Sequence, residues 1–290
     1  MMNHFLRISC CVLLSVSLGA CSANKKSEAK KDRGPVKTVA NTGYRTPSLK
    51  GPVPRNPDMN LPANFNGTAL TISRGLTDRP IIAMTFDDGP NPRNTPRLLD
   101  MLRQRNIKAT FYVIGKNVAM YPQVVRRTVA EGHEIGNHTW DHRLLTKMSN
   151  AQVLSELTRT RDAVAKAAGV VPRTLRPPYG ALSQRQRQFV HEQLGYPTVL
   201  WSVDPLDWKR PGPSVVADRI VSRANNGAII LSHDLHSQTV DAMPQTLDRL
   251  LRKGFKFVTV SQMIAMKEAV SVAAAQKKPP VPADGATAGL

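Results

Sequence analysis

The ten residues IIAMTFDDGP, numbered 81–90, place an apolar run directly before two adjacent carboxylates and a Gly-Pro pair. The apolar run predicts a buried strand, and the Gly-Pro pair ends it. Adjacent residues of a strand point to opposite faces, so Asp87 and Asp88 can share one site only if the chain turns there. We interpret one carboxylate as a metal ligand and the other as a general base. The alternative is that one of them caps the helix that follows the turn.

Outward from this stretch, strand and helix patterns alternate along the chain. The strand candidates are 81–86, 109–115, 133–140, 174–180, 198–204, 228–234 and 255–260. The helix candidates between them are 95–106, 121–132, 151–169, 183–195, 213–226 and 243–254. Strict alternation predicts an α/β domain with parallel strands and helical crossovers. Both a barrel and an open doubly wound sheet satisfy the pattern.

Chemically capable side chains gather where these strand candidates stop. They are the Asp87-Asp88 pair, His138, Arg176, Asp204, Asp207 and His233. In parallel α/β architectures the functional site lies at the carboxyl ends of the strands, so these side chains are expected to meet at one face.

The segment HTWDH, residues 138–142, carries two histidines four residues apart. On one helical turn or a tight loop, the imidazoles of His138 and His142 can face one point. Two histidines and a carboxylate from a neighbouring strand end would leave open metal positions for water and substrate. Zinc in such a site lowers the pKa of bound water toward about 7.

Five motifs give the pattern a specific resemblance. They are TFDDGP (85–90), HTWDH (138–142), RPPYG (176–180), DPLDW (204–208) and ILSHD (230–234). In this order they resemble the motifs of the polysaccharide deacetylases, the NodB-homology domain of carbohydrate esterase family 4. The resemblance covers residues 79–266 and implies a single domain, an irregular (β/α)7 barrel. It also implies metal-dependent hydrolytic N-deacetylation of N-acetylglucosamine residues in a polysaccharide, with Zn²⁺ or, alternatively, Co²⁺.

The resemblance implies a role for each motif residue. Asp87 would be the catalytic base, and Arg176 would orient it. Asp88, His138 and His142 would hold the metal. His233 would be the catalytic acid, with Asp207 as its carboxylate partner.

Three further motif residues would bind substrate by the same resemblance. The backbone N–H of Tyr179 would bind the oxyanion, and Trp208 and Leu231 would hold the acetyl methyl group. Residues beside the motifs receive structural assignments: Asp204 is expected to fix its own loop and Asp234 to make a structural hydrogen bond. His236, close to His233, is expected to lie outside the cleft, with a position lining the cleft as the alternative.

The first 20 residues are typical of an export signal, because Arg7 precedes an apolar stretch, 8–18, that is too short to span a bilayer. Leu18-Gly19-Ala20-Cys21 resembles a bacterial lipobox, which predicts lipidation of Cys21; the alternative is an ordinary signal cut near Ala20. Ser22 resembles the outer-membrane sorting pattern of Gram-negative lipoproteins. Residues 21–78 are then expected to be a low-complexity tether and residues 267–290 a disordered tail.

The chain has a formal net charge of +19, which suits an anionic partner or reflects an excess of solvated lysines. The export signal and the absence of a basic-aromatic stripe argue against nucleic acid. An envelope location favours peptidoglycan, with chitin-like oligosaccharides, exported poly-N-acetylglucosamine and O-acetylated xylan as alternatives. A non-catalytic wall-binding lipoprotein is a further alternative, although no ligand or acid/base position departs from the motifs. A monomer is expected.

Overall fold

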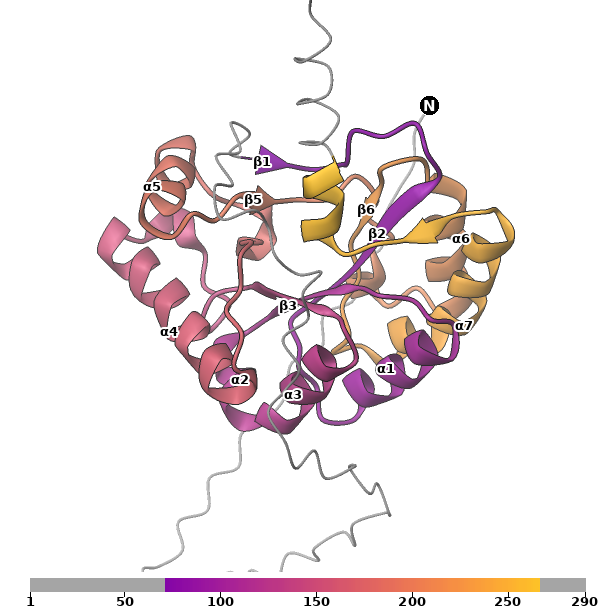
Figure 1. Cartoon of the computed structure of the whole chain (residues 1–290), viewed down its shortest axis with the longest axis horizontal. Helices are drawn as coiled ribbons and strands as arrows, with labels where there is room; N and C mark the ends of the chain where they lie inside the picture. Colours follow the sequence, from indigo (N-terminus) through magenta and orange to yellow (C-terminus); the bar gives the residue numbers. More distant parts are fainter. Residues whose placement is uncertain (1–70, 267–290) are drawn as a thin grey trace, which may run out of the picture. The chain divides into compact units, whose positions relative to one another are not determined.

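Seven parallel strands form the centre of the described part of the chain, residues 71–266, in this computed structural model (Figure 1). The signal segment, Cys21, most of the expected tether and the expected tail lie outside the described residues. The strands are β1 (Thr71–Ile72), β2 (Ile81–Asp87), β3 (Thr110–Val113), β4 (Glu134–Asn137), β5 (Thr198–Val199), β6 (Ile229–Ile230) and β7 (Lys256–Phe257). The α/β class predicted from the alternation is confirmed.

The strands pair as two sheets that single bridges connect. One sheet has the order β4-β3-β2-β6, with β7 also paired to β2, and the other is β1-β5. Leu175 bridges Asn137 of β4 to Thr198 of β5, and Val203 bridges to Ile230 of β6. Single bridges stand in place of full ladders at these points, so the predicted barrel is not closed by continuous strand pairing in this structure.

Strand β2 lies at the centre because all seven of its residues are buried and it pairs with three neighbours. Its alternate side chains enter two different cores. Ile82, Met84 and Phe86 pack beneath the helices, whereas Ile81 and Ala83 pack against other strands. Each large apolar side chain buried in this way contributes roughly 1.5–3 kcal/mol. The odd-numbered face of β2 thus points inward, and Asp87 is its last residue.

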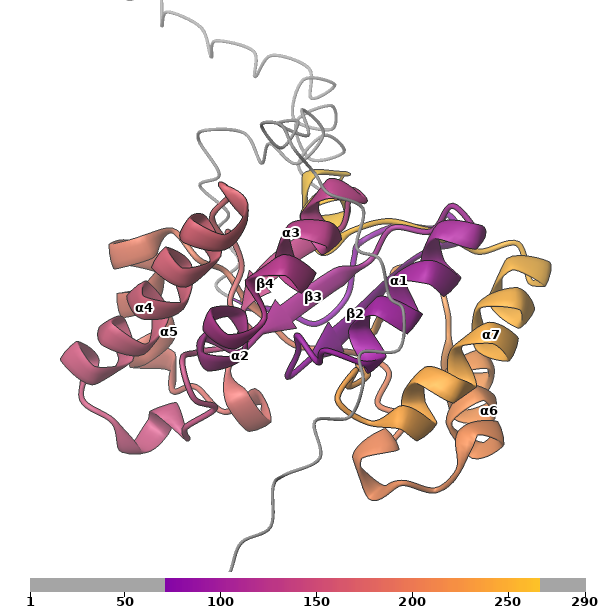
Figure 2. The ribbon, with the colours of Figure 1, turned by 90° about the horizontal axis from the view of Figure 1, so that it is seen from below.

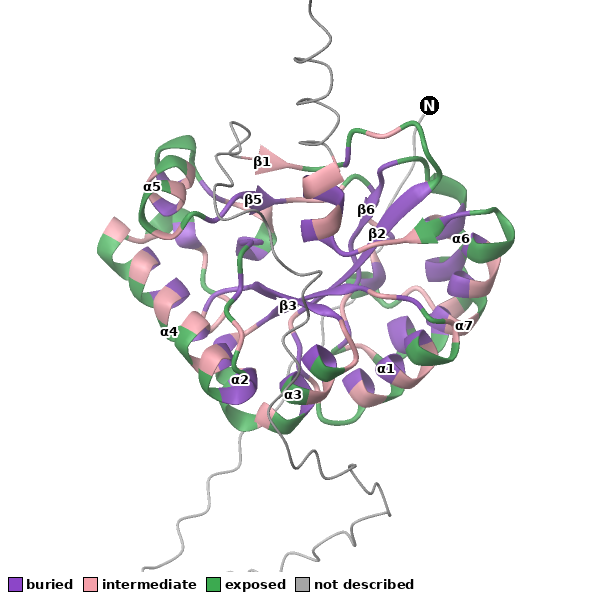
Figure 3. Cartoon of the chain, in the orientation of Figure 1, coloured by how far each residue is buried: buried purple, intermediate pink, exposed green. Residues whose placement is uncertain are grey.

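Seven helices with described bounds surround the strands, and their outward faces are exposed (Figures 2 and 3). They are α1 (Asn94–Gln104), α2 (Gly115–Met120), α3 (Pro122–Ala130), α4 (Asn150–Ala168), α5 (Gln184–Leu194), α6 (Pro213–Arg223) and α7 (Ser237–Arg252). A further helix begins at Val260. All six predicted helices are present, α7 begins six residues earlier than expected, and α2 was not predicted. Among residues 71–266, no helix has the length and apolarity needed to cross a membrane.

Helices α4 and α5 begin and end with the same local signals. Ser149 and Ser183 each accept a hydrogen bond from the backbone of a glutamine three residues on, whose side chain bonds back to the serine. Each helix ends at a glycine in the left-handed region, Gly169 and Gly195. These capping boxes and glycine stops explain why both helices match their predicted bounds closely.

Two predictions about the strands were wrong. The segment 174–180 is not a strand, because only Leu175 pairs and the prolines Pro177 and Pro178 cannot donate ladder hydrogen bonds. Thr71 and Ile72 form β1, a strand that was not predicted, within the segment expected to be a tether. A strand of two residues is too short to show an apolar alternation.

Candidate active site

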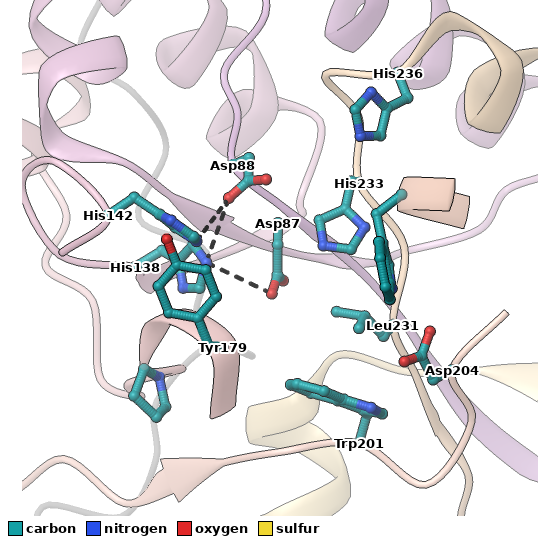
Figure 4. Close-up of a pocket in the computed structure, with 12 residues that line it drawn as sticks. Asp87, Asp88, His138, His142, Tyr179, Trp201, Asp204, Leu231, His233 and His236 are labelled. Atoms are coloured by element: carbon teal, nitrogen blue, oxygen red, sulfur yellow. Dashed lines mark ion pairs between the residues drawn. The ribbon is translucent and has the colours of Figure 1, made fainter. Parts of the chain in front are cut away.

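The turn after β2 brings the two adjacent carboxylates to one cavity. Asp88 has a left-handed backbone (φ 74°), and the Gly89–Pro90 peptide bond is cis. This reversal places both Asp87 and Asp88 in the cavity wall (Figure 4). Neither of them caps α1, whose first backbone N–H groups bond instead to the side chain of Asn91. The helix-cap alternative for this motif is therefore wrong.

Asp88, His138 and His142 form a compact set of potential metal ligands. Their candidate ligand atoms all lie within 4.8 Å of one another, and Asp88 Oδ1 lies 3.4 Å from Nε2 of each histidine. The Nδ1–H of His138 donates to the carbonyl of Arg176 at 2.6 Å, which leaves its Nε2 free to bind a metal. Asp88 Oδ1 is buried and has no hydrogen-bond partner among the described residues. One carboxylate and two imidazoles are a donor set that suits zinc.

The electrostatics keep Asp88 ionised. Burial raises the pKa of its carboxyl group, but the interaction with His138 and the nearby charges of His138, His233 and His142 outweigh it and lower the pKa to about 2. Asp88 therefore offers an anionic oxygen at neutral pH, which is the form that binds a divalent cation.

Arg176 holds Asp87 through buried hydrogen bonds. Its Nη1 donates to Asp87 Oδ1 at 2.8 Å and to the Thr85 hydroxyl at 2.7 Å. The guanidinium is 0% exposed and lies over the Tyr112 ring, with its carbon 4.2 Å from the ring centroid. A planar guanidinium fixed on several sides orients the carboxylate of Asp87 toward the cavity.

His233 lines the cavity across from the metal-ligand set, and the buried Asp207 pairs with it from behind (Figure 4). His233 Nδ1 lies 2.8 Å from Asp207 Oδ1, and the His233 backbone N–H donates to Asp207 Oδ2, also at 2.8 Å. Burial lowers the pKa of His233, but the hydrogen bond and charge of Asp207 prevail and raise it to about 9. The imidazole is therefore protonated at neutral pH and can donate a proton from its free Nε2.

Asp87, the three potential metal ligands and His233 face one cavity of about 440 Å³, and Arg176 and Asp207 are buried behind it (Figure 4). Its lining residues are Asp87, Asp88, His138, His142, Pro177, Tyr179, Trp201, Asp204, Trp208, Leu231, His233 and His236. The predicted substrate-binding residues Tyr179, Trp208 and Leu231 are among them. Tyr179 also packs edge-on against His142, with ring centroids 4.8 Å apart.

Two lining residues were not predicted to be there. His236 was placed outside the cleft, but the turn after β6 and the start of α7 put it in the cavity wall, with its ring centroid 6.1 Å from that of His233. Trp201 was not singled out at all. The alternation of a strand could have predicted its position, because Trp201 follows Val199 by two residues and so points to the same face. Both side chains pack in the core on the inward face of β2.

The neighbouring structural assignments agree with the contacts. Asp204 Oδ1 accepts the Leu206 N–H at 2.7 Å and so fixes its loop, although Asp204 also lines the cavity. Asp234 is fully buried and accepts a hydrogen bond from the Thr95 hydroxyl. It lies against the turn that carries Asp88, because a Cβ on Gly89 would collide with its carboxylate.

Comparison with known proteins identifies a family. A family model for polysaccharide deacetylase matches residues 74–199. The chain is 42% identical over 186 residues to a peptidoglycan-N-acetylglucosamine deacetylase of Listeria monocytogenes, an alignment that covers 64% of this chain and 39% of that protein. It is 34% identical over 224 residues to a peptidoglycan-N-acetylglucosamine deacetylase of Bacillus cereus, covering 73% of this chain and 81% of that protein.

A solved structure shows the same fold. The peptidoglycan deacetylase PdaC from Bacillus subtilis superposes with a TM-score of 0.64 at 37% sequence identity, covering 69% of this chain and 96% of that chain. This chain therefore spans 39% of the length of the Listeria relative but most of the Bacillus cereus relative and of the solved PdaC chain.

Proposed function

The chain belongs to the polysaccharide deacetylase family, and on this basis we propose that it removes acetyl groups from N-acetylglucosamine residues of peptidoglycan. The observation that carries the proposal is that one cavity holds the Asp88-His138-His142 triad together with a carboxylate, Asp87, and a protonated histidine, His233. The names of the Listeria and Bacillus relatives support peptidoglycan as the polymer. An N-acetylated chitin-like oligosaccharide is the alternative substrate.

Asp87 acts as the general base in this proposal. A divalent metal, most simply zinc, held by Asp88, His138 and His142 would supply an acidified water and a polarised acetyl carbonyl. Asp87 removes a proton from the attacking water, and the hydrogen bond from Arg176 orients its carboxylate. The backbone N–H of Tyr179 stabilises the negative charge that develops on the carbonyl oxygen.

His233 acts as the general acid. An amide nitrogen leaves poorly until it is protonated, so the amine product needs a proton donor at neutral pH. The ion pair with Asp207 holds the His233 imidazole in its protonated form and directs its Nε2 away from the pair. Leu231, which is 3% exposed, and Trp208 form an apolar wall for the acetyl methyl group.

Acetate release tests the proposal. Purified full-length protein with added zinc is incubated with peptidoglycan, with N-acetylglucosamine oligomers and with O-acetylated xylan, beside the Asp87→Asn protein. We expect acetate from peptidoglycan, and its loss in the variant. Acetate from xylan alone would replace the deacetylase with an O-acetyl esterase. Bound zinc without acetate from any of the three would contradict both, and no acetate and no bound zinc would favour a wall-binding scaffold.

We also propose that the chain is an envelope lipoprotein, anchored through Cys21 to the outer membrane of a Gram-negative bacterium. The support is the lipobox-like sequence 18–21 followed by Ser22. An anchored enzyme on a tether would meet its polymer in the periplasm.

A further inference from the structure

A rim loop, residues 207–212, borders the cavity on the side of the catalytic acid. The loop begins in the 3₁₀ turn Asp207–Lys209, and Arg210 follows with a left-handed backbone (φ 52°). The buried carboxylate of Asp207 anchors one end through His233 and Thr239. The Gly212 N–H anchors the other end by donating to Gln238 Oε1 at 3.2 Å. The contacts fix the path of the rim loop.

The rim loop presents one aromatic and two cationic side chains next to the cavity. Trp208 lines the cavity and is 50% exposed. The ammonium group of Lys209 lies 5.1 Å from the centroid of the Trp208 ring, and Arg210 is exposed directly after it. Neither cation has an ion-pair partner within residues 71–266.

Besides burial, the positive charge of Arg210 lowers the pKa of His236, which lines the cavity. Burial lowers the pKa of His236, the Asp207 carboxylate raises it, and the positive charges of His233 and Arg210 lower it. Arg210 directly follows Lys209 in the rim loop, whose Trp208 lines the cavity together with His236.

Neither Asp204 nor Asp207, the acidic residues on this side of the cavity, forms an ion pair with the two cations. Asp207 is buried and already bonded to His233 and Thr239. Asp204 lines the cavity, but its Oδ1 accepts the backbone N–H of Leu206. An aromatic ring at the cavity, with one unpaired cation against it and a second at the next residue, is a suitable surface for a saccharide that carries negative charge.

We propose that Lys209 and Arg210 form a subsite for a carboxylate on the saccharide next to the residue that is deacetylated. This inference rests on the proposed function, because it assigns the subsite to the same polymer. In peptidoglycan the neighbouring sugar is muramic acid, whose lactyl carboxyl group is amide-bonded to the stem peptide and is a free carboxylate only where that peptide has been removed. A neutral chitin-like polymer gives these cations nothing to bind. The subsite thus selects peptidoglycan strands without stem peptides over neutral polymers.

Binding to a matched pair of glycans tests the subsite. The probes are a tetrasaccharide of alternating N-acetylglucosamine and N-acetylmuramic acid with free lactyl carboxylates, and its methyl ester, which removes only the charge. Purified protein is kept in chelator so that no acetate is released. Dissociation constants are read from the indole N–H signal of Trp208, one of three tryptophans in the chain.

We expect the free acid to bind more tightly than the ester. The double variant Lys209→Gln/Arg210→Gln should weaken binding of the acid by about threefold to tenfold, as exposed charge pairs do, and leave the ester unchanged. Added salt should reduce the difference in affinity between the free acid and the ester. The control variant Arg185→Gln/Arg252→Gln removes two exposed charges that do not line the cavity, one of them at the far end of α7 from His236, about 24 Å away. It should retain the preference.

Three results would overturn the subsite: equal binding of acid and ester by the unaltered protein, an equal loss for both glycans in the double variant, or no shift of the Trp208 signal with either glycan. Since the measurement needs no turnover, a negative acetate assay leaves this test intact. Failure of the deacetylase proposal and failure of the subsite are therefore separate outcomes.

Discussion

Asp87 and Asp88 are neighbours in the sequence but have different partners. The guanidinium of Arg176 holds Asp87, whereas two imidazoles face Asp88. We expect Asp87→Asn to retain zinc and to lose about 10²–10⁴-fold in deacetylation rate, as removal of a general base does. Asp88→Asn should lose zinc as well as activity. Zinc content by mass spectrometry and acetate release separate the two roles, and equal zinc loss in both variants would contradict this division.

The His233-Asp207 pair predicts how activity depends on pH. With its pKa raised to about 9, His233 is protonated at neutral pH, and activity should fall as pH rises through about 9. Asp207→Asn removes the largest effect that raises the pKa, so this alkaline decline should move toward the ordinary histidine value of 6.5. A pH–rate profile checks the shift. An alkaline decline that stays near pH 9 in the variant would exclude His233 as the titrating acid.

The same pair contributes to stability with a definite sign. A histidine whose folded pKa lies above its unfolded value stabilises the fold fully below 6.5 and loses that contribution as pH rises through about 9. The unfolding free energy of the unaltered protein should therefore decline over this window more than that of Asp207→Asn. Urea denaturation at pH 6 and pH 9.5 measures both, and parallel declines would contradict the coupling.

The motif residues could be assigned from the sequence because each carries its chemistry in its own side chain and in a fixed local order. The structure places most of them in the wall of one cavity, and Arg176 and Asp207 bond to Asp87 and His233 from behind it. The lining residues Trp201 and His236 could not be assigned in the same way, because their positions depend on where a strand and a helix start in space. No local sequence pattern predicts that a helix begins at Ser237 and that His236 therefore lies beside His233.

At the scale of elements, helix α4 holds the loop that carries both histidine ligands. Glu156 of α4 is buried, and its Oε2 accepts the backbone N–H groups of Trp140 at 2.9 Å and Asp141 at 3.2 Å. The Leu157 carbonyl accepts the side-chain amide of Asn137 at 2.9 Å. The helix therefore bonds the loop on both sides of His138, and Glu156 is a positioning residue for the metal ligands.

We expect Glu156→Ala to weaken zinc affinity by about 10–100-fold, because supporting contacts of metal ligands have effects of that size. Glu156→Gln should recover most of it, since an amide oxygen can accept the same two N–H groups. Asp162→Ala, an exposed position on the same helix, is the control and should bind zinc normally. Competition with a zinc chelator measures affinity. If Glu156→Gln binds as weakly as Glu156→Ala, the acceptor role is wrong.

The elements predicted well are those with a long apolar period and explicit ends. Helix α4 has 19 residues, a capping box and a glycine stop, so its first and last residues can be predicted from the sequence. Short elements carry no such period: β1 has two residues and α2 has six. The segment 174–180 lies between β4 and β5 in space, yet its two prolines leave only Leu175 to pair with them. Tertiary contacts, rather than local propensity, decide these cases.

At the scale of the whole molecule, the parallel direction of the strands explains why distant motifs meet. Asp87 ends β2, His138 follows β4, and His233 follows β6 by three residues. Helices cross over between them, so every carboxyl end reaches the same face. The ring of pairing is incomplete at Leu175 and Val203, and the RPPYG and DPLDW motifs directly follow these single bridges. Because strand pairing ends at these bridges, the residues that follow them can leave the strand direction, and Tyr179 and Trp208 line the cavity.

The location of the enzyme depends on the other end of the chain, and a cysteine comparison tests it. The chain has three cysteines, and Cys10 and Cys11 are predicted to leave with the signal. In a Gram-negative host, radiolabelled palmitate should appear on the unaltered protein and on Cys11→Ala but not on Cys21→Ala. The cavity-lining residues all lie between 87 and 236, so purified Cys21→Ala should release acetate at the unaltered rate. Label retained by Cys21→Ala would contradict lipidation there, and label absent from all three would favour an ordinary signal cut near Ala20.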